Sequence, residues 1–213
     1  MNSSRKGAFK IGPNFLAISV FCLLAVIFMY FTVVNALIAH GRMADEVSSY
    51  NSSLHWATTL APWSADAAIA YAAYLRGYAV TASMPEKAKT LSVIHELIDS
   101  AIAKRPLWPY YQLAKYDAEV LSGASEVALQ ARFDGIRSLA PNERGVDLSL
   151  IQTSLYVWDS LKGSQQNWIG VQMLGMQREK RDDLLLQISS LKTYNPRLCT
   201  QLPWKLVKRA CQE

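Results

Sequence analysis

The sequence IGPNFLAISVFCLLAVIFMYFTVVNALIA, residues 11–39, decides how this chain folds and where it lies. It holds 29 consecutive residues without Asp, Glu, Lys, Arg or His. An apolar helix of about 20 residues is long enough to cross the roughly 30 Å hydrocarbon core of a bilayer. The pattern therefore predicts one transmembrane helix over residues 13–39, in contact with membrane lipid, and places the rest of the chain beside the membrane.

A cleaved signal peptide is the alternative interpretation of this region, because a short basic stretch precedes the apolar one. The apolar part of a signal peptide is about 7 to 15 residues long and ends at a small-x-small cleavage site. Here the apolar run is about twice that length, and its end, NALIAH at residues 35–40, matches such a site poorly. A retained anchor is preferred, and cleavage stays open.

The flanks of the apolar run predict its orientation. The leader, residues 1–12, carries Arg5, Lys6 and Lys10 and no acid, whereas residues 42–46 mix one Arg with Asp and Glu. Basic residues stay on the cytoplasmic side of a membrane. We therefore expect a cytoplasmic N-terminus and an extracytoplasmic main domain, which in a Gram-negative cell means a bacterial inner-membrane anchor and a periplasmic domain.

The cysteines agree with that compartment. Cys22 falls inside the apolar run, while Cys199 and Cys211 lie near the end of the chain. Two thiols in an oxidising compartment usually pair, so the sequence predicts a C-terminal tail, residues 196–213, closed by a Cys199–Cys211 disulfide. Two free thiols are the alternative, and a zinc site is disfavoured because no His lies near the pair.

Charge and motifs exclude several functions. The formal net charge of +5 is scattered, so no nucleic-acid partner is expected. The patch of Lys205, Lys208 and Arg209 suits glycan or anionic headgroups but is more often solubilising, and glycan contact stays unsupported. His40, His55 and His95 have no metal-ligand spacing, and no nucleophile elbow, phosphate loop or Cys-x-x-Cys is present. We predict no enzyme activity, no cofactor and no metal.

Apolar residues recur at three- and four-residue spacing through nearly all of the chain after residue 60, and no stretch alternates with a period of two. This pattern predicts an all-α domain of six or seven helices over residues 61–195, preceded by a membrane-proximal connector over residues 40–60. The expected stripes include Ala68, Tyr71, Leu75 and Tyr78 and, further along, Leu91, Ile94, Ile98 and Ala101.

Prolines divide this domain at regular intervals. Pro62, Pro106 and Pro141 each precede a helical stripe, where a proline costs little, and they are 44 and 35 residues apart. That interval is the size of a helix-turn-helix repeat. The pattern predicts antiparallel helical hairpins that bury a continuous core by stacking.

Residues 60–160 resemble a tetratricopeptide repeat. In that family a large apolar residue, then a small one three positions later, precede the proline that ends the second helix, as Ile98, Ala101 and Pro106 do here. The Trp-x-x-Leu-Gly pattern of the first helix is not cleanly present, so a helical bundle without true repeats is the alternative.

The whole layout resembles VpsP-like polysaccharide-biosynthesis proteins: a basic leader, one anchor, a compact helical domain and a terminal cysteine pair. The segment RPLWPYY, residues 105–111, is similar to repeat segments of membrane-bound glycan polymerases and ligases. The resemblance implies an accessory role in exopolysaccharide biosynthesis or export and brings no catalytic residue.

Aromatic residues at helix starts are the candidate partner surface. Trp108, Tyr110 and Tyr111 are predicted to border a concave surface that receives a peptide or helix from a protein partner in the cell envelope, with core packing as the alternative. The sequence thus favours a membrane-anchored scaffold for envelope assembly. The second candidate is a structural subunit of a larger membrane complex, such as a secretion, pilus or respiratory assembly.

Overall fold

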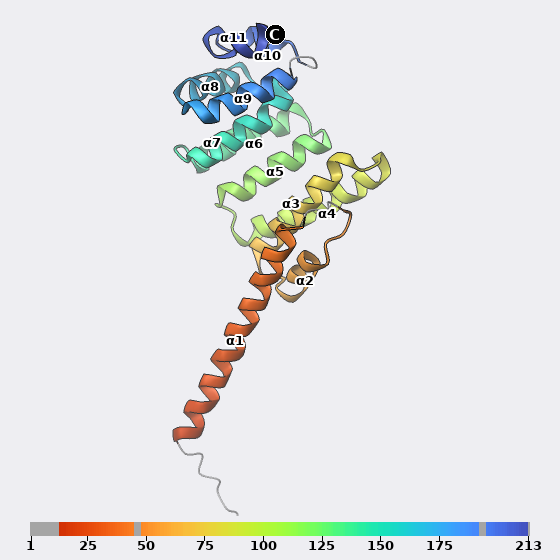
Figure 1. Cartoon of the computed structure of the whole chain (residues 1–213), viewed down its shortest axis with the longest axis vertical. Coiled ribbons are helices and arrows are strands. Elements are labelled where there is room, and N and C mark those ends of the chain that lie inside the picture. The colour runs from red at the N-terminus through yellow and green to blue at the C-terminus, as the bar shows by residue number, and fades with distance from the viewer. Residues whose placement is uncertain (1–12, 45–47, 192–194, 213) are drawn as a thin grey trace, which may run out of the picture.

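The computed structural model describes residues 13–44, 48–191 and 195–212, and those residues form eleven α-helices and one 3-10 helix with no strand. The leader with Arg5, Lys6 and Lys10 lies outside them. One long helix projects from a helical domain, and the C-terminus lies at the opposite end of the molecule (Figure 1). The predicted all-α class is confirmed.

Helix α1 (Pro13–Arg42) is, within the described part of the chain, the one helix long and apolar enough to span a membrane. Phe21 and Phe28 are more than 70% exposed, as expected of side chains that face lipid. Its last third is different, because Val34 and Ile38 are buried against α2 (Ser52–Leu60). The apolar run therefore contains both a free apolar surface and part of the domain core.

Helix α2 lies in the stretch interpreted from the sequence as a connector. The Asn51 side chain caps it by accepting from the Leu54 amide at 3.1 Å, and its Nδ2 donates to the Gly41 carbonyl at 3.0 Å. A Cβ on Gly41 would lie 2.4 Å from Leu54 Cγ, so only glycine permits this approach of α2 to α1. These contacts join α1 to the domain.

Two helical hairpins follow. Helices α3 (Ala65–Thr81) and α4 (Met84–Lys104) are joined by two residues, and α5 (Pro109–Ser122) and α6 (Glu126–Leu139) by three. Gly123 ends α5 with φ of 72°, a left-handed conformation that glycine adopts without steric cost. Because the connections are so short, the helices of each pair run antiparallel.

The three proline turns share one backbone conformation. The residue before Pro62, Pro106 and Pro141 ends the preceding helix with φ between −122° and −140° and ψ between 63° and 73°. The amide three positions after that residue donates back to its carbonyl at 2.8 to 3.4 Å. A proline disfavours the helical conformation of the residue before it, so each proline ends one hairpin and starts the next, as the spacing predicts. Membership of the tetratricopeptide class stays a prediction.

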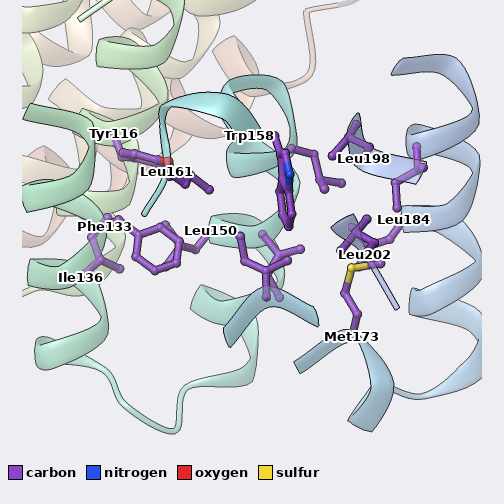
Figure 2. Packing of buried hydrophobic residues seen from close by; sticks show 14 of the residues in the cluster. Tyr116, Phe133, Ile136, Leu150, Trp158, Leu161, Met173, Leu184, Leu198 and Leu202 are labelled. Atoms are coloured by element: carbon purple, nitrogen blue, oxygen red, sulfur yellow. The ribbon is translucent and has the colours of Figure 1, made fainter. Parts of the chain in front are cut away.

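The C-terminal half continues as α7 (Arg144–Ser154), η1 (Leu155–Ser160), α8 (Gly163–Gly175), α9 (Arg178–Leu191), α10 (Arg197–Gln201) and α11 (Trp204–Gln212). Together with α5 and α6, these helices enclose one apolar cluster, and Trp158 stands at its centre with no exposed surface (Figure 2). The indole N–H of Trp158 donates to Gln201 on α10.

Cys199 and Cys211 form the predicted disulfide, with their Cα atoms 5.8 Å apart, and it joins α10 to α11. Leu198 and Val207 on these helices have no exposed surface and belong to the same cluster as Trp158. The stretch described from the sequence as a tail is therefore the last layer of the core.

Candidate functional site

Of the three aromatic residues proposed from the sequence, Tyr111 is not at the surface, and that part of the prediction is wrong. Its side chain is 3% exposed and packs with Ala65, Ala68 and Ala101 between α3 and α4. Its hydroxyl donates to Asp66 Oδ1 at 2.7 Å. Burial and this hydrogen bond raise the pKa of Tyr111 to about 12. Tyr111 holds two hairpins together.

Trp108 and Tyr110 are 47% and 40% exposed, at the start of α5. The Tyr110 hydroxyl donates to Glu143 Oε1 at 3.0 Å and lies beside Gly145. Tyr110 thus links the turn before α5 to the turn before α7. Trp108 alone of the three keeps an exposed ring without such a hydrogen bond, and its ring stacks loosely on Tyr110 at 6.0 Å.

A different surface brings side chains of several helices together. A groove of about 770 Å³ is lined mainly by α3, α5 and α7, with further residues from α4 and η1. On α3, α5 and α7 the lining residues recur at i, i+3 and i+4 spacing, so each of these helices presents one face to the groove. The lining consists of Ala73, Arg76, Gly77 and Val80 on α3, Lys87 on α4, Asp117, Val120 and Leu121 on α5, Ser149, Gln152 and Thr153 on α7, and Tyr156 and Val157 on η1.

The floor of the groove is polar. Asp117 pairs with the Arg76 guanidinium and accepts from the Thr153 hydroxyl, so this carboxylate links α5 to α3 and to α7. Burial raises the pKa of the Asp117 carboxyl, while the Thr153 hydrogen bond and the Arg76 charge oppose that rise. Because Asp117 is 17% exposed and Arg76 45%, the floor presents donor groups to a ligand more than acceptors.

The rim of the groove is apolar and basic. Val80 on α3 and Tyr156 on η1 are 67% and 63% exposed, and Lys87 on α4 also lines the groove. The Asp117 charge is engaged by Arg76, so Lys87 leaves the groove with an unbalanced positive charge. Such a surface suits an extended or helical segment with apolar side chains and an acidic residue.

The three histidines do not meet. His40 and His55 lie on α1 and α2, where His40 contacts the Ser53 hydroxyl at 3.0 Å and His55 packs on Tyr50. His95 lies on α4, and burial lowers its pKa. Within the described ranges no three His, Cys, Asp or Glu side chains gather as metal ligands.

Sequence reasoning missed the groove because its residues flank the buried stripes rather than form them. A signal was present: Arg76, Asp117 and Thr153 are polar residues inside the first helix of successive proline-delimited units. Polar side chains inside the otherwise apolar helices of neighbouring units can mark a face that these helices share.

No family model, no curated protein and no solved structure matches this chain. The resemblance to VpsP-like proteins therefore stays a prediction from the layout of the sequence.

Proposed function

We propose that this protein is a single-pass membrane scaffold whose extracytoplasmic domain binds a segment of a partner protein in the groove between α3, α5 and α7. The groove itself carries the proposal, because α3, α5 and α7 each contribute one helix face to it and its rim stays apolar and exposed. Surfaces built from the repeated faces of stacked hairpins commonly receive peptides or helices.

The proposed compartment is the outer side of a bacterial inner membrane. The basic leader favours a cytoplasmic N-terminus, and the Cys199–Cys211 disulfide suits an oxidising compartment. The proposed process is exopolysaccharide biosynthesis or export, on the layout that resembles VpsP-like proteins. The scaffold would position envelope partners and perform no chemistry of its own.

The second candidate function, a structural subunit held by its span, is less well supported by the polar residues of α1. The Asn35 amide donates to the Phe31 carbonyl at 3.0 Å, and the Thr32 hydroxyl to the Phe28 carbonyl at 2.9 Å. Each of these donor groups therefore has a partner within α1 and does not require a neighbouring span.

Photocrosslinking in intact cells tests the groove. A photoreactive phenylalanine analogue in place of Val80 or Tyr156 should yield the same protein adduct from both positions, and in place of Val127, which is 76% exposed on α6, it should not. Lys87→Glu should reduce the adduct several-fold, while Lys104→Glu on the same helix should leave it unchanged. Equal adducts from all three positions, or none from Val80 and Tyr156, would overturn the proposal.

A further inference from the structure

The length of α1 sets the level at which the domain meets the bilayer. Thirty residues at about 1.5 Å each make a helix about 45 Å long, roughly 15 Å longer than the hydrocarbon core. Lys10 precedes the helix, so the membrane segment begins near Pro13. Tyr30 then lies about 26 Å along the helix, at the outer edge of the hydrocarbon. Tyr30 is already partly covered by the domain, and full burial of α1 by protein begins at Val34.

The C-terminal end of α2 is held at the level of Tyr30. The Tyr30 hydroxyl donates to the Leu60 carbonyl, and the Tyr30 ring lies 5.8 Å from the ring of Trp63. In Figure 1, α2 lies beside the upper part of α1, at the edge of the domain nearest the anchor. A membrane that holds α1 therefore also reaches the surface formed by α2 and the turn that follows it.

This surface has the chemistry of a membrane–water interface. Trp56, Leu60 and Trp63 are 54%, 40% and 59% exposed. From residue 47 to residue 65 the sequence holds no Asp, Glu, Lys or Arg. Tryptophan and tyrosine concentrate at the headgroup level of membranes, where an apolar ring and a polar edge are both accommodated.

We propose that Trp56, Leu60 and Trp63 sit in the outer lipid interface and form a second membrane contact beside the span. The proposal rests on the proposed anchoring by α1. Two contacts, joined through Asn51 and Gly41, would fix the tilt and the height of the domain. The groove would then be held at a fixed distance from the membrane. A partner bound in the groove would be presented at that distance.

Tryptophan quenching in the full-length chain tests this inference. The protein is reconstituted in phosphatidylcholine–phosphatidylglycerol vesicles whose acyl chains carry bromine close to the headgroups, and its fluorescence is compared with that in unbrominated vesicles. The wild-type chain should be quenched, and the Trp56→Phe/Trp63→Phe variant should lose most of that quenching. The matched Trp108→Phe/Trp204→Phe variant removes two tryptophans of similar exposure, 47% and 54%, and should keep it.

Two further measurements separate the possible failures. Alkaline extraction reports anchoring: a chain released from the vesicles contradicts the proposed span, whereas a chain that stays but shows no quenching overturns this inference alone. Equal quenching in both double variants also overturns the inference. The second measurement is photocrosslinking: a photoreactive residue in place of Trp63 that forms adducts with protein and not with lipid overturns it as well. Unchanged thermal melts by circular dichroism show that the variants are folded.

Discussion

Removing residues 33–43 is expected to cost the domain a large share of its stability. A fragment that begins at residue 44 lacks Val34 and Ile38, which are 5% and 7% exposed and cover α2. Burial of a Val or Ile side chain contributes about 1.5 to 3 kcal/mol, so the loss is about 3 to 6 kcal/mol, and uncovering Leu54 adds to it. A domain of this kind is stable by only about 5 to 15 kcal/mol. Two fragments, residues 33–213 and residues 44–213, are expressed with export from the cytoplasm. Chemical denaturation of both measures the difference in their free energies of unfolding.

Point variants of fragment 33–213 separate the effect of the buried side chains from the effect of chain length. Val34→Ser with Ile38→Ser in fragment 33–213 should lower the denaturation midpoint towards that of fragment 44–213. Val33→Ser is the matched control, because Val33 is 48% exposed and should leave the midpoint nearly unchanged. Equal stability of the two fragments would show that α1 and the domain are independent.

Truncating Trp158 to alanine should destabilise the fold by about 3 to 5 kcal/mol, the usual cost of removing a buried large aromatic side chain. Trp158 has no exposed surface, and its ring stands between the helices of the C-terminal half (Figure 2). The variant also removes the hydrogen bond to Gln201, but Gln201 is exposed, so water can replace the lost donor and the change comes mainly from the core. Guanidinium denaturation of the full chain in detergent, followed by circular dichroism, measures the change.

Trp204→Ala is the control for this experiment. Trp204 is 54% exposed at the start of α11, and exposed substitutions usually change stability by less than about 0.5 kcal/mol. A Trp158→Ala chain as stable as Trp204→Ala would mean that the cluster around Trp158 is not the core of the C-terminal half.

The sequence predicted the features that local rules decide. Helical periodicity gave the all-α class, and proline chemistry placed the turns at Pro62, Pro106 and Pro141, since a proline disfavours the helical region for the residue before it. The Cys199–Cys211 pairing followed from the number of cysteines and the expected compartment, and the structure confirms it.

The sequence could not predict features that depend on whether lipid, water or protein surrounds a side chain. Phe28 faces outward and Ile38 faces protein, yet both belong to one uninterrupted apolar run, because lipid and a protein core select the same residue types. Tyr110 and Tyr111 are adjacent and chemically alike, and only the rotation of α5 against its neighbours makes one half-exposed and the other buried. Helix α2 was missed because nine residues with two buried positions, Leu54 and Ala57, give no helical period.

The location of the C-terminus tests the central claim most directly. A fusion of alkaline phosphatase, which is active only outside the cytoplasm, to residue 213 of the full chain should be active, and a fluorescent protein that matures only in the cytoplasm should be dark at the same position. Membrane insertion with the basic leader inside predicts this pair of results. An inactive phosphatase together with a bright fluorescent protein would contradict the span orientation, the outer groove and the interfacial contact at once.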